Sequence, residues 1–180
     1  MRIHEAVIRQ NLQLLAQGRE LLERMDDSVY GAELPHLAAR PVGCHFRHTL
    51  DFYDRLLSGA ATGRVDYDAR VRKQRIEEER AAALEEIERL RQGLEALVQC
   101  DPEQPIEVNL DNALEGTGEV IWSQSTLLRE LQGLVSHTVH HYALIGILLK
   151  AKGFEPGSEF GVAPSTLEYE RRTGTLPRRG

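Results

Sequence analysis

The sequence predicts an all-α fold, a four-helix bundle with a small β-hairpin or an ordered crossover between its third and fourth helices. Two observations lead to this class. Four segments carry apolar residues three or four positions apart among polar ones, the spacing of an amphipathic helix, and turn-forming residues separate them. The chain has 180 residues, enough for one domain, and four such helices bury their apolar stripes most economically against one another.

The first two predicted helices span residues 3–25 and 42–58. The first has apolar residues at helical spacing throughout. Residues 26–41 contain one glycine and two prolines, so we expect a loop there with one short turn. The second helix begins after Pro41, because proline suits the first turn of a helix. Two glycines within the next five residues end it.

The third predicted helix is long and continuous, residues 71–98, and is rich in Glu, Arg, Ala and Leu. We interpret the charged run at residues 77–80 as a solvated face of that helix. Two prolines within the next seven residues end it. Residues 106–110 then alternate apolar and polar side chains, as a half-buried strand does, and residues 118–122 are the candidate partner strand, across a Gly-Thr-Gly turn.

The last long helix is predicted at residues 125–152. It begins at a serine, a good N-cap, and Gly153 is its C-terminal stop. One short helix is predicted at residues 164–171. We therefore divide the chain into a bundle, residues 1–153, and a C-terminal extension that packs on it, residues 154–180.

Composition narrows the class of protein. The net charge of -6 argues against a nucleic-acid surface, which normally carries a basic excess. The charged N-terminus is unlike a secretory signal, and no apolar run has the length of a membrane span. The two cysteines, Cys44 and Cys100, give no disulfide framework and favour a reducing compartment. We expect a cytoplasmic protein with no membrane or nucleic-acid partner.

Histidines of the last helix are the first candidates for a functional site. His137 and His141 fall one turn apart on its apolar stripe, whereas His140 lies about 100° away from His141 on the helix circumference. Imidazoles that face a core need partners, because unpaired buried polar groups cost free energy. One metal ion satisfies both, and the i, i+4 spacing suits it. The alternative is a pair of hydrogen-bonded histidines at the edge of the core.

A third ligand should come from another helix, because two ligands make a weak site. The second helix offers Cys44, His45 and His48. On a helical wheel His45 lies within the apolar face and His48 just outside its edge, so spacing alone favours His45 slightly. Cys44 is better interpreted as a small apolar residue.

Two segments, residues 40–51 (RPVGCHFRHTLD) and 136–145 (SHTVHHYALI), carry a resemblance to a known family. They resemble the glycine-containing second helix and the HxxxH segment of the DinB-like (DinB/YfiT) superfamily of metal-dependent four-helix bundles. By position His48 falls on the family's first metal ligand, and His137 and His141 on the second and third. The resemblance therefore favours His48 over His45. The chain departs from the family pattern directly after His141, where Tyr142, Ala143 and Leu144 replace the family's Arg-Gly-Gln.

The resemblance also implies a function. Three neutral imidazoles leave a coordination position open, which is typical of catalytic sites. Related proteins include thiol-dependent transferases, an isomerase and an iron-dependent sulfoxide synthase. We expect a metal-dependent hydrolase or thiol-dependent transferase that acts on a small molecule, such as a low-molecular-weight thiol. The divalent ion would be zinc, nickel or iron.

Two other classes stay open from the sequence. One is a non-enzymatic stress-response or binding protein with a structural metal, and the other has no metal and hydrogen-bonded histidines. An open coordination position separates catalysis from a structural ion. The long helices expose faces that can pair in a homodimer. The further candidates for contact with the ligands or a substrate are His45, Asp51, Tyr53, Tyr67 and Tyr142.

Overall fold

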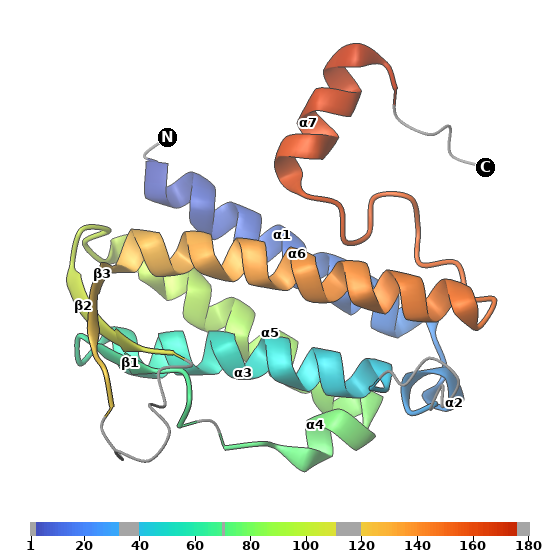
Figure 1. Ribbon diagram of the computed structural model, residues 1–180, viewed down its shortest axis with the longest axis horizontal. Coiled ribbons are helices and arrows are strands. Elements are labelled where there is room, and N and C mark those ends of the chain that lie inside the picture. Colours follow the sequence, from blue (N-terminus) through green and yellow to red (C-terminus); the bar gives the residue numbers. More distant parts are fainter. Residues whose placement is uncertain (1–2, 33–39, 70, 111–119, 176–180) are drawn as a thin grey trace.

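The computed structural model describes residues 3–32, 40–69, 71–110 and 120–175, and the chain is mostly helical with a small sheet (Figure 1). Among these residues the elements are α1 (Ile3–Arg24), α2 (Asp27–Tyr30), α3 (Val42–Ala60), β1 (Arg64–Asp66), α4 (Gln74–Glu78), α5 (Arg80–Ala96), the short 3-10 helix η2 (Leu97–Gln99), β2 (Pro105–Asn109), β3 (Ser123–Thr126), α6 (Leu127–Ala151) and α7 (Pro164–Thr173). The predicted predominance of helix is confirmed.

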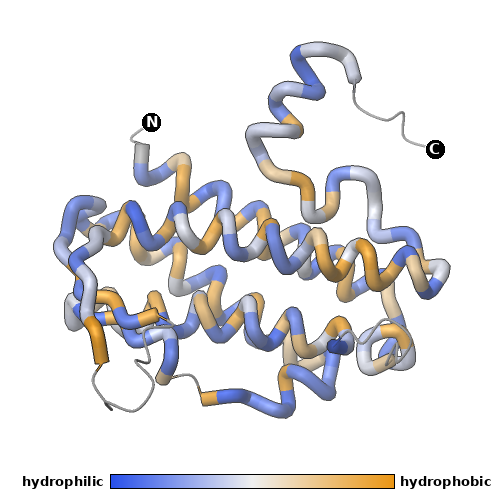
Figure 2. The backbone as a smooth tube through the Cα atoms, viewed as in Figure 1, coloured by the Kyte–Doolittle hydropathy of each residue, from blue (hydrophilic) through white to orange (hydrophobic). Residues whose placement is uncertain are grey.

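Four long helices enclose the core. Helix α1 packs against α5 and α6, and α3 packs against the same two helices. In Figure 1, α6 and α3 face the viewer and α1 and α5 lie behind them. Fully buried side chains come from all four, among them Leu15, Leu50, Leu90 and Ile145. Each such side chain contributes about 1.5–3 kcal/mol of burial free energy. Figure 2 shows that the C-terminal half of α6 is strongly apolar.

The prediction of a single helix over residues 71–98 is wrong. Two helices, α4 and α5, occupy this stretch, and Glu79 between them has extended backbone, with φ -112° and ψ 110°. The hydroxyl of Tyr30 donates to the carbonyl oxygen of Ile76 at 2.5 Å, and that oxygen would serve the next turn in an unbroken helix. Ala82 and Ala83 instead donate to the Glu79 carbonyl. The carbonyl oxygens of Ile76 and Glu79 therefore both accept hydrogen bonds at the break.

Gly43 explains how closely α4 lies on α3. A Cβ added at Gly43 would overlap the carbonyl oxygen of Glu77 and come within 2.9 Å of the Tyr30 ring. Because one of these atoms belongs to the backbone, a larger side chain requires α4 to move. The glycine that the family resemblance singled out therefore allows two helices to touch.

The sheet differs from the predicted hairpin. Strand β2 lies where the first strand was expected, but its antiparallel partner is β3, and the described part of the predicted partner strand, residues 120–122, belongs to no strand. The second neighbour of β2 is β1, which runs parallel to it and for which the sequence predicted no strand. The proposed Gly-Thr-Gly turn lies outside the described residues. Three-residue β1 has one buried side chain, Val65, so it offered too short a pattern to identify.

The start of α6 also shifts. Ser125 pairs with Ile106 in the sheet, and the helix is capped by Thr126, whose hydroxyl accepts from the Arg129 amide. The end matches the prediction: Gly153 has φ 76°, a left-handed conformation that favours glycine. Within the described part of the chain, no helix combines the length and the apolar character that crossing a membrane requires.

The segment after α6 contacts the helices before α7 begins. Phe160 stacks on Tyr142, with ring centroids 4.7 Å apart. The Arg24 guanidinium donates to the carbonyl oxygens of Glu155 and Pro156 at 2.7 and 3.1 Å. These contacts hold the start of the extension against α1 and α6. The division of the chain at residue 153 stays a prediction.

Candidate metal centre

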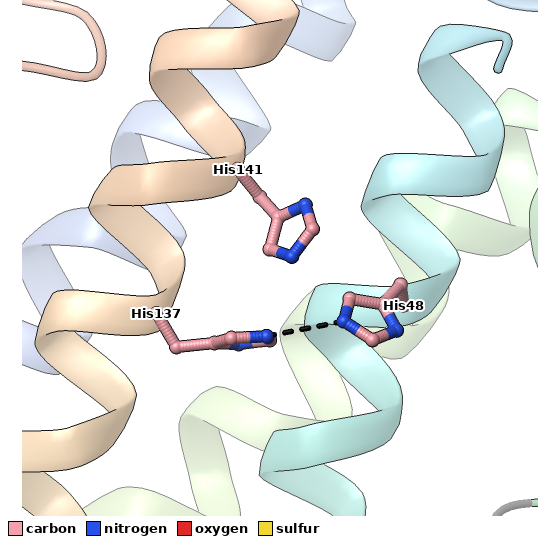
Figure 3. Close-up of side chains that lie close together, drawn as sticks. All are labelled: His48, His137 and His141. Carbon is pink, nitrogen blue, oxygen red and sulfur yellow. Dashed lines mark hydrogen bonds between the residues drawn. The ribbon is translucent and has the colours of Figure 1, made fainter. Parts of the chain in front are cut away.

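Helices α3 and α6 bring three histidines together. His48 projects from α3, and His137 and His141 project from α6, so that the rings meet between the two helices (Figure 3). One ring nitrogen of each lies within 4.8 Å of one nitrogen of the other two. All three side chains are partly buried. The structure thus juxtaposes the three residues that the resemblance selected.

The spacing of the nitrogens fits one ion. The Nε2 atoms of His48 and His137 are 3.1 Å apart. Two nitrogens bound tetrahedrally to zinc at 2.0–2.1 Å would lie about 3.3 Å apart. The centroid of the His141 ring lies 4.5 Å from that of His48 and 4.6 Å from that of His137. The same 3.1 Å distance also suits a hydrogen bond between two neutral imidazoles. A shared metal ion and a hydrogen bond between the rings both require at least one unprotonated ring nitrogen.

The surroundings keep His141 neutral. Burial, and after it the neighbouring imidazoles, led by His137 and His48, together lower the pKa of His141 to about 3. Burial also lowers the pKa of His45, with His140 as the second cause. A neutral imidazole is the form that binds metal, so no proton has to leave His141 at pH 7.

Aromatic packing fixes the His137 ring from one side. Phe52 stacks on it with centroids 4.0 Å apart and an interplanar angle of 28°. Tyr67, just after β1, stacks on Phe52 at 4.9 Å and donates its hydroxyl to Glu130 at 3.0 Å. Glu130 also accepts from Ser125 in β3 at 2.5 Å. The sheet therefore supports one end of the site.

His45 lies on the same side of α3 as His48. Its Nδ1 atom is 3.1 Å from Nδ1 of His141. His45 therefore faces α6 too, but it is the His48 nitrogen that lies with those of His137 and His141. His140 is exposed, and its ring centroid is 5.2 Å from that of His141.

Two other sequence candidates, Cys44 and Asp51, face α4. Arg47 donates to Asp51 at 3.0 Å and to Glu77 at 2.8 Å, and Asp51 is only 3% exposed. The Cys44 thiol donates to the other oxygen of Glu77 at 2.6 Å. Burial, followed by the Glu77 carboxylate, raises the pKa of Cys44 to about 11. These groups join α3 to α4 and hold the thiol protonated.

Tyr53 and Tyr142 lie in the core. The Tyr53 hydroxyl donates to Asn11 and accepts from Thr138. Tyr142 packs between Phe46 and Phe160. Tyr53 therefore contacts buried side chains of α1 and α6, and Tyr142 contacts α3 and the C-terminal extension.

Sequence reasoning did not single out Phe52 or Glu130. Phe52 is four residues after His48 and Glu130 seven before His137, spacings that place each on the side of its helix that carries the histidine. That periodicity is the signal by which both could have been found.

Comparison with known proteins gives two matches. The sequence profile of the DinB superfamily matches residues 10–145, a stretch that includes the three clustered histidines. The protein FK506-binding protein 5 of Rhizopus delemar is 30% identical over 108 residues, which are 60% of this chain and 28% of that protein. The chain therefore spans about a quarter of the length of this curated relative.

Proposed function

This chain belongs to the DinB superfamily, and from that premise we propose that it is a metal-dependent enzyme in which His48, His137 and His141 hold one divalent ion. The observation that supports the proposal is the convergence of three imidazoles from α3 and α6. We also propose that α1, α3, α5 and α6 form the four-helix bundle of this superfamily.

The donor set indicates the class of ion. Imidazole nitrogen suits zinc, nickel and iron, and the cluster that supplies it contains no carboxylate or thiolate within the described residues. Three protein ligands leave a position for a substrate atom. An ion held in this way acts as a Lewis acid, which lowers the pKa of a bound water or thiol or polarises a carbonyl group.

The protein's own side chains have simpler roles in this proposal. His48, His137 and His141 supply lone pairs, and the stack of Phe52 and Tyr67 keeps the His137 ring in place. The reaction is the hydrolysis of a small molecule or a transfer to a low-molecular-weight thiol. The protein acts as a cytoplasmic homodimer in this proposal.

A substrate screen tests the enzymatic part. The purified protein is loaded with zinc, nickel or ferrous ion and incubated with panels of esters, amides and thiol–electrophile pairs, and products are followed by mass spectrometry. We expect turnover by the loaded wild type and its loss in His48→Ala. Equal turnover in His48→Ala, or in protein stripped of metal, contradicts the proposal.

A second candidate is a non-enzymatic binding protein with a structural ion. The observation that favours it is the likeness to part of a longer protein whose name describes binding of FK506. Cobalt(II) substitution separates the two candidates. A visible spectrum that shifts when a small thiol is added indicates an accessible coordination position and supports the enzyme. A spectrum indifferent to thiol supports the structural ion.

A further inference from the structure

His45 makes a contact that the three-histidine site does not itself require. It lies on α3 three residues before His48, is partly buried, and places Nδ1 3.1 Å from Nδ1 of His141. The two ring centroids are 5.4 Å apart and the planes are tilted by 46°. The contact is therefore made through the nitrogens, at hydrogen-bonding distance, and not through stacked ring faces.

This contact constrains which nitrogen of His141 carries a proton. A neutral imidazole has one N–H donor and one acceptor nitrogen, so two Nδ1 atoms at this distance need one of each. When His141 donates from Nδ1, its lone pair is on Nε2. When His45 donates, the His141 lone pair points at His45 and its proton is on Nε2. Only the first arrangement leaves Nε2 of His141 able to bind an ion.

We propose that His45 is a positioning residue for His141: it accepts the Nδ1–H of His141 and thereby holds that ring with Nε2 available to the ion shared with His48 and His137. This inference rests on the proposed metal site. Metal-binding histidines commonly donate their second nitrogen to a carboxylate, a carbonyl or water, which fixes the tautomer and the ring orientation. Here a second imidazole, supplied by the helix that carries His48, takes that role.

The placement on α3 has a structural consequence. Since His45 and His48 come from the same helix face, α3 supplies both a ligand and the acceptor that orients a ligand of α6. The backbone around His45 is held by Thr49, whose hydroxyl donates to the His45 carbonyl at 2.9 Å. The acceptor is thus attached to a regular helix, which restricts how far its ring can move.

A matched pair of variants isolates the acceptor. In His45→Asn, Oδ1 takes nearly the place of Nδ1 and can accept the same hydrogen bond. His45→Leu has the same branching at Cγ and no acceptor. Zinc affinity is measured by competition with a chromophoric chelator, and His140→Leu, at the exposed neighbour, is the control. We expect His45→Leu to bind zinc about 10–100-fold more weakly, and His45→Asn and His140→Leu to bind within about threefold of the wild type.

Nitrogen-15 NMR of the zinc-loaded protein gives a readout that simple packing would not change. The Nδ1–H of His141 should be observed and protected from exchange in the wild type and His45→Asn, and lost in His45→Leu. Should His45→Leu fail to fold, His45→Gln replaces it, because its amide reaches the Nε2 position and not Nδ1. It is expected to show the same weakening.

Three results overturn the inference while the metal site stands. The first is unchanged zinc affinity in His45→Leu or its replacement, and the second is equal weakening in His45→Asn and His45→Leu. The third is the loss of one nitrogen ligand from zinc in His45→Leu, measured by X-ray absorption, which would make His45 itself a ligand. A wild type that binds no zinc overturns the proposed function and this inference together. The first three results therefore remain distinguishable from failure of the site itself.

Discussion

The Nε2 atoms of His48 and His137 lie 3.1 Å apart although the two residues are 89 positions apart in the chain. Helix α3 carries the first and α6 the second, so the site exists only while these helices keep their packing. A buried polar network stabilises that packing. Tyr53 of α3 bonds to Asn11 of α1 and to Thr138 of α6, the residue after His137.

Tyr53→Phe tests this network. The change removes the hydroxyl that donates to Oδ1 of the buried Asn11 and accepts from Thr138, which costs about 1–3 kcal/mol. We expect the free energy of unfolding in urea to fall by that amount. Tyr169→Phe is the control, because Tyr169 is 56% exposed and its loss should change stability by less than about 0.5 kcal/mol. Equal effects at the two tyrosines would contradict the role of the network.

Tyr142→Phe should act in the opposite direction. The Tyr142 hydroxyl is buried and has no hydrogen-bond partner among the described residues. Removing it relieves the desolvation cost of an unsatisfied polar group and keeps the ring that packs on Phe46 and Phe160. We predict unchanged or higher stability, by up to about 1 kcal/mol, in the same urea assay. A loss of 2 kcal/mol, on the order expected for a lost buried hydrogen bond, would show that the hydroxyl has a partner.

Gly18→Ala tests how closely α1 approaches α6. An added Cβ would overlap the Tyr142 hydroxyl and lie 3.0 Å from the ring carbon that bears it. We expect a loss of about 1–3 kcal/mol from overpacking, partly restored in the double variant with Tyr142→Phe. Gly133→Ala is the matched control in another helix, because its Cβ would meet only the tip of Arg129. It should be neutral or stabilising, since alanine favours helix more than glycine does.

The Glu77 carboxylate should make stability depend on pH. The Cys44 thiol, and after it Arg47, hydrogen-bond to this carboxylate and hold its pKa below the ordinary value. A carboxyl with a lowered folded-state pKa stabilises the protein above its unfolded pKa of about 4.5, and the contribution is lost as the pH falls through the folded value. We expect Glu77→Gln to be less stable than the wild type at pH 7, with the difference shrinking below pH 4.5. A difference that is constant from pH 7 to pH 3 would rule out this linkage.

Much of the helical layout follows from the sequence, because apolar spacing is a local signal. The starts of α1 and α3 fall where periodicity and Pro41 place them. The break at Glu79 could not be seen in this way, because its cause is a bond from Tyr30, 46 positions before the Ile76 carbonyl that it reaches. Strand β1 was missed for a related reason, since its pairing partner β2 is about 40 residues away.

The candidate site shows a similar limit. His137 and His141 could be selected from the apolar stripe of α6, because both lie on the face that meets α3. The wheel slightly favoured His45 over His48, but both rings face α6 and they differ in which histidine nitrogen they approach. That choice depends on the rotation of α3, which tertiary packing sets.

The number of metal ions bound by the purified protein tests the central claim most directly. Elemental analysis after loading with zinc and removal of excess ion should give one equivalent per chain in the wild type. His48→Ala, His137→Ala and His141→Ala should each retain less than about a tenth of that, since two ligands make a weak site. His140→Ala, at the exposed neighbour, should retain the full equivalent. One equivalent in all three ligand variants, or none in the wild type, would contradict a shared ion at these histidines.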